Sequence, residues 1–461
     1  MDQLGWDELD VLLVTGDAYV DHPAFGVALL GRWLADHGYR VGIVAQPRWE
    51  SPEDLACMGR PRLFAGVAAG ALDSMLAHYT AFRKLRHDDA YTPGNRHGAR
   101  PNRACIVYTN LVRQAFPGLP VVLGGIEASL RRATQYDFWS DKLRRSILLE
   151  SKADIVVYGM GERALLEIAQ RLEHCGDTAK RPTDYLCGIP GTTFAPPRDH
   201  ALPPDAEALP SHEDILANTD NLMTATLAFE QQIHHAGPCL AQESGGRRVV
   251  FMPPAAPLTE AELDRIYSLP FTRRPHPSYT EPVPAVEMIQ FSVTTHRGCA
   301  GGCSFCSLAL HQGRGIVSRS AHSVEDEIRT LTRHPDWKGS LSDIGGPSAN
   351  MWASRCTADP RQCGRGSCLS PEICPHFADG QGELAGLLKR ITSIPGMANV
   401  RVASGVRYDL AMETPAYVRT LVGDFVGGQL KLAPEHCVDT VLEHMRKPGF
   451  KVFERFLSVF E

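Results

Sequence analysis

The chain has 461 residues, of which 43% are hydrophobic and 22% are charged, and its formal net charge is −6 at pH 7. This length allows more than one packed core. Proteins that bind nucleic acid mainly through charge are basic overall, and the negative net charge of this chain excludes it from that class. The chain has neither an apolar run long enough to cross a membrane nor an N-terminal export signal, so we expect a cytoplasmic protein with no membrane partner.

The first 190 residues alternate short β-branched runs with helical segments. Strands are predicted at residues 11–14, 40–44, 105–108, 120–123 and 154–159, and helices at 29–38 and 162–172. This alternation is typical of a parallel sheet with helices on both faces. We therefore predict that residues 1–190 form a doubly wound α/β domain.

Regular periodicity fades between residues 191 and 285. Prolines crowd at 195–210, 253–257 and 270–284, although residues 211–233 have the composition of helices. This pattern predicts a proline-rich linker with partial structure.

A second α/β series occupies residues 286–461. Strands are predicted at 289–293, 341–344, 400–404 and 429–433, with helices at 323–332, 383–392 and 438–445, and residues 451–461 fit one amphipathic helix. Strands that alternate with helices in this way predict a (βα) barrel.

Cysteines indicate where chemistry takes place in this second series. The thirteen cysteines are an odd number in a chain without an export signal, which argues for reduced thiols. Cys299, Cys303 and Cys306 follow a predicted strand at C-x3-C-x2-C spacing in a glycine-rich loop. Three thiolates can hold a [4Fe-4S] cluster and leave its fourth iron open to a small molecule. Zinc is the alternative and would need His296 or His311 as a fourth ligand; unligated core cysteines are another.

A second group of cysteines lies further along the chain. Cys356, Cys363, Cys368 and Cys374 have C-x6-C-x4-C-x5-C spacing in a segment rich in Gly, Pro and Arg. Four thiols so close together predict a second metal site, either zinc or an auxiliary cluster. The alternative is four reduced, unligated cysteines.

Other residues of the predicted barrel agree with a cofactor at the cluster. Gly345, Gly346 and Pro347 follow a strand, and glycines there expose backbone groups on the face where barrel sites form. Arg319 and Glu327 are candidates to hold a loop and a helix in place, and a solvated helix face is the alternative. Residues at the ends of the third and fourth strands are candidates for contacts to the carboxylate and ribose of a cofactor, or for structural roles: Ser404, Arg407 and Lys431.

Long segments of the chain resemble the YgiQ family of radical S-adenosylmethionine proteins, whose substrate is uncharacterised. The resemblance rests on residues 14–23, 86–93, 124–132, 297–306, 403–409 and 431–436. It implies a [4Fe-4S] cluster on Cys299, Cys303 and Cys306 whose open iron is chelated by S-adenosylmethionine, with Gly345, Gly346 and Pro347 at the methionyl amino group. The implied reaction is reductive cleavage to a 5′-deoxyadenosyl radical, with an electron from a reductant such as flavodoxin or ferredoxin.

The resemblance also implies that the barrel is partial. The family pattern continues past the last residue, and about four strands are fewer than such barrels usually have. We therefore expect a chain truncated after the fourth strand, with an unpaired sheet edge, a tendency to aggregate, and weak or absent activity.

The N-terminal domain resembles the cobalamin-binding domain that often precedes a radical barrel. A corrinoid would lie at the carboxyl ends of the strands, near residues 15–25, 124–125 and 159–162. The sequence departs from the D-x-H-x-x-G pattern of a histidine-ligating site, because Asp21 directly precedes His22 and the next glycine is Gly26. This departure argues against cobalt ligation by His22, and a substrate-holding or structural domain is the alternative.

Two further functions stay open. One is an RNA- or protein-modifying methyl or methylthio transferase, and the other is a non-catalytic iron–sulfur sensor. Basic groups at 83–87, 131–132 and 144–145 are candidates for phosphate contacts, but solvated surface is the simpler interpretation. An acidic chain with short basic runs gives little support to a nucleic-acid partner, so the substrate stays unknown.

Overall fold

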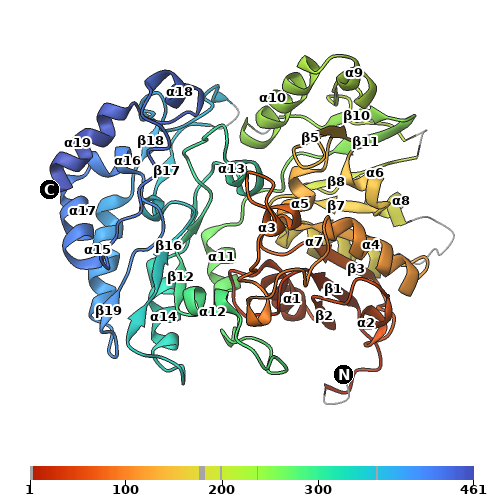
Figure 1. Ribbon diagram of the computed structural model, residues 1–461, viewed down its shortest axis with the longest axis horizontal. Helices are drawn as coiled ribbons and strands as arrows, with labels where there is room; N and C mark the ends of the chain where they lie inside the picture. The colour runs from red at the N-terminus through yellow and green to blue at the C-terminus, as the bar shows by residue number, and fades with distance from the viewer. Residues whose placement is uncertain (1–3, 176–181, 198–199, 236, 360–361, 461) are drawn as a thin grey trace. The chain divides into compact units, whose positions relative to one another are not determined.

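In the computed structural model, which describes residues 4–175, 182–197, 200–235, 237–359 and 362–460, the chain divides into two units (Figure 1). Unit 1 consists of Met1–Ala256 and Phe271–Glu287, and unit 2 consists of Pro257–Pro270 and Met288–Glu461. Among the described residues, no helix combines the length and the hydropathy that a membrane-spanning segment requires.

Unit 1 is built on a sheet with the order β2-β1-β3-β4-β7-β8-β11-β10-β9. Its first five strands are parallel: β1 (Val11–Thr15), β2 (Val41–Ala45), β3 (Phe64–Ala68), β4 (Val121–Gly124) and β7 (Ile155–Val157). In chain order this arrangement is 2-1-3-4-5, the order of flavodoxin-like doubly wound folds.

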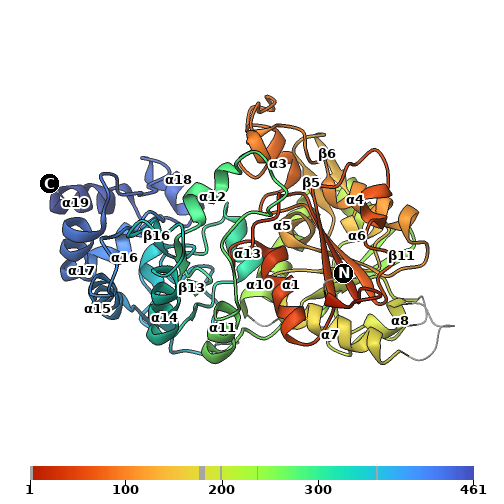
Figure 2. The same cartoon turned by 90° about the horizontal axis from the view of Figure 1, so that it is seen from below.

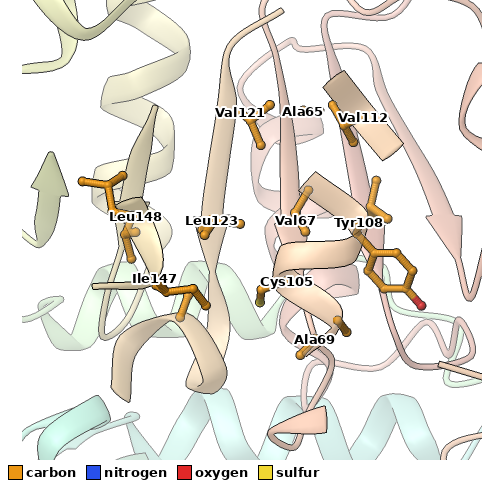
Figure 3. Close-up of a cluster of buried hydrophobic side chains, with 14 of the residues drawn as sticks. Ala65, Val67, Ala69, Cys105, Tyr108, Val112, Val121, Leu123, Ile147 and Leu148 are labelled. Atoms are coloured by element: carbon orange, nitrogen blue, oxygen red, sulfur yellow. The ribbon is translucent and has the colours of Figure 1, made fainter. Parts of the chain in front are cut away.

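Helices cover both faces of this sheet because the strands bury both sets of side chains. Val11 and Leu13 join one apolar cluster with α1 (Gly26–Asp36) and α7 (Glu162–Glu173). Leu12 and Val14 join the other with α4 (Ala104–Ala115) and α6 (Ile147–Ser151), part of which Figure 3 shows. Figure 2 shows α4 and α7 on opposite sides of the strands. The predicted α/β fold is confirmed, and the parallel strands carry helices on both faces.

One predicted strand of this domain is wrong. Residues 105–108 lie in α4, where Cys105, Tyr108 and Val112 point from one face of the helix into the core. These three residues are spaced as on one face of a helix. The β-branched residues between them favoured the two-residue period of a strand over the helical period. Strand β3 was not predicted, because its sequence contains glycine and alanine rather than a long β-branched run.

The segment predicted as a linker contributes strands to the same sheet. It contains β8 (Thr192–Phe194), β9 (Glu207–Ala208), β10 (Leu240–Ser244) and β11 (Arg247–Phe251), with α9 (His212–Ala217) and α10 (Asp220–His235). β8 pairs antiparallel with β7, and β10 and β11 form a hairpin closed by Gly245 and Gly246, both at positive φ. Residues 191–256 therefore belong to unit 1, and only the helices expected within 211–233 are confirmed.

Unit 2 has short parallel pairs of strands where the barrel was predicted. β12 (Ser292–Thr294) pairs with β16 (Asp343–Gly345), and β15 (Ser340–Leu341) pairs with β19 (Asn399–Val400). The predicted strand at 429–433 is reduced to a single parallel bridge between Val406 and Leu432. Val293, Leu341 and Val400 fill the core of this unit. These pairings agree with part of a barrel, and the barrel itself stays a prediction.

The helices predicted in unit 2 are confirmed. They are α14 (Ala321–Leu331), α15 (Gln381–Thr392), α18 (Asp439–His444) and α19 (Phe450–Phe460), with α11 (Glu260–Tyr267), α13 (Ser307–Gln312), α16 (Tyr408–Met412) and α17 (Pro415–Thr420) in addition. α15 packs between α14 and α17 (Figure 2).

Shorter elements complete the two units. In unit 1 they are α2 (Glu53–Ala56), α3 (Ser74–His78), α5 (Gly125–Leu130), α8 (Pro182–Leu186), α12 (Pro284–Ile289), β5 (Gln135–Asp137) and β6 (Lys142–Arg144), although the end of α12 reaches into unit 2. In unit 2 they are β13 (His296–Arg297), β14 (Val317–Ser318), β17 (Arg355–Cys356) and β18 (Phe377–Ala378).

Candidate functional site

The three-cysteine loop, residues 298–306, leaves the β13–β14 hairpin and enters α13. Two glycines give the loop its shape. Gly298 has φ +84, and a Cβ there would lie 2.0 Å from the carbonyl oxygen of Gly315. Gly302 has φ +57, and a Cβ there would lie 2.4 Å from the carbonyl oxygen of Gly366. Only glycine fits at either position, so the loop depends on both residues.

The loop brings its cysteines together. The Sγ atoms of Cys299 and Cys303 lie 3.5 and 3.6 Å from the position that a Cβ of Gly301 would take. Burial raises the pKa of the Cys299 thiol, and the nearby Cys303 and Cys306 raise it further, while Gly301 and Arg407 lower it. Three thiols this close repel one another as thiolates, and a bound cation relieves that repulsion.

A single metal ion in the three-cysteine loop would require ligands that converge on one point. Among the described residues, no three His, Cys, Asp or Glu side chains converge on one point as ligands of an ion do, and this includes His296 and His311. An iron–sulfur cubane binds each cysteine through a different iron atom, so its ligands need not share one point. The cluster on Cys299, Cys303 and Cys306 and the zinc alternative both stay predictions.

Arg407 lies against this loop. Its Nη1 donates to Sγ of Cys303 at 3.6 Å, its Nε donates to Oδ1 of Asp409 at 2.9 Å, and the residue is 7% exposed. Burial lowers the pKa of Arg407, but the hydrogen bonds and charge of Asp409 outweigh burial and hold it above its usual value. The structure thus places the predicted cofactor contact Arg407 as a permanent positive charge beside the cysteines.

Residues after α18 complete the positive side of the site, and the sequence patterns did not single them out. Lys447 is 6% exposed, and its Nζ lies 3.8 Å from Oε1 of Glu435. Burial and the charge of Arg407 lower the pKa of Lys447. Arg446 donates from Nη1 to the carbonyl oxygen of Gly302 at 3.4 Å. A dibasic pair before Pro448-Gly449 was the only signal for them.

The predicted glycine turn lies beside the start of the three-cysteine loop. Thr295 donates its backbone N–H to the carbonyl oxygen of Gly345 at 2.7 Å. A Cβ on Gly346 would lie 2.7 Å from Nε2 and 2.8 Å from the carbonyl oxygen of His296. Burial lowers the pKa of His296 to about 4, so its ring is neutral at pH 7. The turn can approach the loop this closely only because Gly346 has no side chain.

Of the two remaining predicted contacts, one lies at this turn. The backbone N–H of Ser404 donates to Oδ1 of Asp343 at 3.0 Å, and the Ser404 hydroxyl also bonds this carboxylate. The Oγ of Ser404 lies 3.5 Å from the position that a Cβ of Gly345 would take. Lys431 is exposed, and its carbonyl oxygen accepts from the N–H of Val406 at 3.0 Å. The structure therefore brings Ser404 to the turn and joins Lys431 to the site through its backbone only.

A buried amide that the sequence patterns did not single out holds Arg407 in place. Oδ1 of Asn350 accepts from the backbone N–H of Arg407 at 2.9 Å, and its Nδ2 donates to the carbonyl oxygen of Arg407 at 2.9 Å. The same Nδ2 donates to Oε1 of Gln381 at 3.0 Å. No local pattern marks such residues, because their partners lie far away in the sequence.

The predicted supporting role of Arg319 and Glu327 agrees with the structure. Arg319 forms an ion pair with Glu327, donates to the carbonyl oxygen of Thr294 at 2.9 Å, and lies 4.4 Å from the ring centroid of Tyr267. This buried guanidinium joins the end of β12 to α14 and α11.

The second cysteine group lies in a segment that is hydrogen-bonded to the three-cysteine loop. Cys368 donates its backbone N–H to the carbonyl oxygen of Ala300 at 3.1 Å, and Ser367 donates from Oγ to the carbonyl oxygen of Gly301 at 2.6 Å. These bonds connect the segment that carries Cys356, Cys363, Cys368 and Cys374 to the loop that carries the other three.

In unit 1, the carboxyl ends of β1 and β3 are filled by the chain itself. Arg100, whose side chain is 0% exposed, pairs with Asp17 and Asp89 at 2.8 Å each and donates to the carbonyl oxygen of Ala69 at 3.1 Å. His22 has both ring nitrogens engaged, Nδ1 by the N–H of Ala24 at 3.0 Å and Nε2 by Arg273 at 3.0 Å. These residues do not fit a corrinoid with a histidine ligand at the predicted position.

Sequence comparisons group this chain with proteins of one family. Residues 1–292 match the family described as Radical SAM N-terminal. The UPF0313 protein of Geobacter sulfurreducens is 54% identical over 99% of this chain and 75% of its own length. The UPF0313 protein of Methanosarcina acetivorans is 47% identical over 99% of this chain and 64% of its own length, and that of Thermotoga neapolitana is 48% identical over 100% and 81%.

Solved structures with a similar fold are more distant in sequence. The radical S-adenosylmethionine methyltransferase TsrM from Kitasatospora setae, with tryptophan substrate and the SAM analogue aza-SAM bound, has a TM-score of 0.53 at 16% identity, over 98% of this chain and 65% of its own. The cobalamin-dependent S-adenosylmethionine radical enzyme OxsB, with aqua-cobalamin bound, has a TM-score of 0.52 at 9% identity, over 98% and 48%. These likenesses concern the fold.

Proposed function

Because this chain belongs to the UPF0313 family, of the YgiQ-like radical S-adenosylmethionine type, we propose that it is a radical enzyme that cleaves S-adenosylmethionine reductively. The observation that carries the proposal is the proximity of Cys299 and Cys303 beside Arg407, with the Gly345–Gly346 turn packed on the start of the same loop. A non-catalytic sensor needs the cysteines but has no use for that turn.

Cys299, Cys303 and Cys306 are the proposed ligands. A [4Fe-4S] cluster held there would supply the electron for breaking the carbon–sulfur bond of S-adenosylmethionine and an open iron for its amino and carboxyl groups. Arg407 offsets the negative charge of the thiolates, and its own position is fixed by Asp409 and by Asn350. The protein contributes ligands, a fixed positive charge and a shaped turn.

The turn supplies polar backbone groups without side chains. Gly346 faces His296 too closely for any Cβ, and Gly345 lies against Ser404, whose hydroxyl is engaged by Asp343. A methionyl amine can thus be received by backbone carbonyls of a turn that two buried contacts hold rigid. The neutral ring of His296 adds no competing positive charge.

The experiment that tests this function is anaerobic reconstitution with iron and sulfide, followed by reduction in the presence of S-adenosylmethionine. Formation of 5′-deoxyadenosine and methionine supports the proposal. A matched variant, Cys303→Ser, should form neither product, whereas Cys57→Ser, an exposed cysteine of unit 1, should behave as the unchanged chain.

A methyl or methylthio transferase is the second candidate, because TsrM is described as a methyltransferase. Transfer of the methyl group itself would release S-adenosylhomocysteine, which the same experiment detects. A cobalamin ligated by His22 is not included in our proposal, since both ring nitrogens of His22 are engaged and Arg100 with its two carboxylates lies at the ends of the neighbouring strands. The substrate on which the radical acts stays unassigned.

A further inference from the structure

A long loop between β17 and β18 contains three cysteines and has little apolar core of its own. Of its described residues, only Ser367, Leu369 and Cys374 are buried. Ordering each residue of a loop costs on the order of 1–2 kcal/mol, and a loop this long without regular structure needs a stabilising element. Apolar burial at Leu369, with the partly buried Cys368 and Ile373, cannot offset the cost.

Backbone hydrogen bonds bring three of the four cysteines of this region together. Cys356 is the register partner of Phe377 in the β17–β18 pair. Phe377 donates its N–H to the carbonyl oxygen of Cys374 at 2.9 Å, and Cys374 donates to the carbonyl oxygen of Cys368 at 2.8 Å. The two ends of the loop and its middle thus meet at the cysteines.

The fourth cysteine reaches the same place through a neighbouring arginine. Arg365, two residues after Cys363, donates from Nη2 to the carbonyl oxygens of Ser370 at 3.2 Å and Glu372 at 2.6 Å. These bonds place the segment that follows Cys363 against the part of the loop between Cys368 and Cys374.

We propose that Cys356, Cys363, Cys368 and Cys374 bind a second iron–sulfur cluster, which fastens this loop to the three-cysteine loop. A zinc ion with four cysteine ligands draws its sulfurs to about 3.8 Å from one another, as Zn–S bonds of about 2.3 Å require. No such convergence on one point occurs among the described residues, either here or at Cys299, Cys303 and Cys306. Among the described residues the second set thus shares with the first the lack of a single-ion arrangement, and we assign it the same kind of centre.

The second cluster differs from the first in its ligands and therefore in its chemistry. Four protein thiolates leave no open iron, so this cluster does not bind S-adenosylmethionine. Its place is set by the bonds from Cys368 to Ala300 and from Ser367 to Gly301, which lie between two ligands of the first cluster. Through these bonds, the binding free energy of the second cluster would hold the three-cysteine loop in the shape that the first cluster needs.

The test is a metal count on the full chain after anaerobic reconstitution, together with acid-labile sulfide and zinc. We expect about eight iron atoms per chain and about four in the double variant Cys363→Ser/Cys368→Ser. Cys57→Ser/Cys437→Ser, which changes two exposed cysteines, should keep about eight. About four irons in the unchanged chain and in both double variants would overturn the proposal. One zinc per chain that is lost only in the first variant would also overturn it.

A second measurement covers the case in which the double variant does not fold. In the unchanged chain, added S-adenosylmethionine should shift the electron paramagnetic resonance signal of one reduced cluster and leave an equal signal unshifted. A single signal that shifts completely would contradict a second cluster. Neither readout depends on product formation, so both remain informative if the enzymatic proposal fails.

Discussion

Arg407 donates a hydrogen bond from Nη1 to Sγ of Cys303 at 3.6 Å, and the same guanidinium bonds Asp409 through Nε at 2.9 Å. The pair places a buried positive charge at the proposed cluster and fixes it there. A positive charge stabilises a reduced cluster more than an oxidised one, because reduction adds a negative charge. Arg407 is therefore expected to tune electron transfer as well as geometry.

Arg407→Gln should lower the reduction potential of the proposed cluster. Coulomb's law at the effective dielectric constant of proteins gives of the order of 2 kcal/mol for the lost charge, or roughly 100 mV for one electron. The measurement is a redox titration followed by electron paramagnetic resonance. Arg419→Gln, on the exposed surface of α17, is the matched control and should not shift the potential. Equal potentials in the two variants would show that Arg407 has no electrostatic role.

Gly346→Ala should both destabilise unit 2 and reduce cleavage of S-adenosylmethionine. The added Cβ would lie 2.7 Å from Nε2 and 2.8 Å from the carbonyl oxygen of His296, so the backbone must move. Overpacking of this kind costs about 1–3 kcal/mol. Urea unfolding and the 5′-deoxyadenosine yield measure the two effects.

The control for that variant is Gly382→Ala in α15, where a Cβ would meet no atom within 4 Å. This control should leave the cleavage of S-adenosylmethionine unchanged. Its free energy of unfolding should be unchanged or slightly higher, since alanine has a higher helix propensity than glycine. If both variants behave alike, the tight approach of Gly346 to His296 is not needed for the site.

Glu327→Gln should destabilise unit 2 strongly. Arg319 is 1% exposed, and the variant leaves its charge buried without the carboxylate. Breaking a buried ion pair from one side costs about 3–5 kcal/mol. Urea unfolding compares it with Glu383→Gln, an exposed residue of α15. A loss below 1 kcal/mol in Glu327→Gln would mean that Arg319 finds other partners.

Much of this architecture could be predicted from the sequence, and the errors share a cause. Strands β1, β4 and β7 are continuous apolar runs buried on both faces, and such runs can be recognised as strands in the sequence. Residues 105–108 have the same local composition but pack as one face of α4, which only tertiary packing decides. The segment 191–256 was predicted as a linker because its prolines outweighed the paired glycines at 245–246 that close its hairpin.

For the site, spacing found the cysteines but not the residues that position them. Cys299, Cys303 and Cys306 are neighbours in sequence, so local pattern reveals them. Asn350 and Lys447 act on Arg407 and its surroundings across large sequence distances, and no single-chain pattern encodes such a pairing. At the ends of the strands in unit 1, local patterns likewise did not indicate that Arg100 pairs with Asp17 and Asp89.

Stability should depend on pH through Asp17. Burial raises the pKa of Asp17 to about 6, although Arg100 lowers it. Between pH 4 and pH 6 the folded chain then holds a proton that the unfolded chain has released, so this carboxyl contributes less to stability as pH rises through the window. The slope approaches about 1.4 kcal/mol per pH unit. Asp17→Asn should remove this contribution. Urea unfolding at pH 4.5 and pH 7 measures it, and an identical pH dependence in both proteins would contradict the assignment.

The central claim is that Cys299, Cys303 and Cys306 hold a cluster that cleaves S-adenosylmethionine. The direct measurement is the yield of 5′-deoxyadenosine from the anaerobically reconstituted, reduced chain, set against the same chain with Cys299→Ser, Cys303→Ser or Cys306→Ser. Our account predicts product from the unchanged chain and none from the three variants, each of which should also lose about four irons. A reconstituted chain that carries its full iron and forms no 5′-deoxyadenosine would contradict the account.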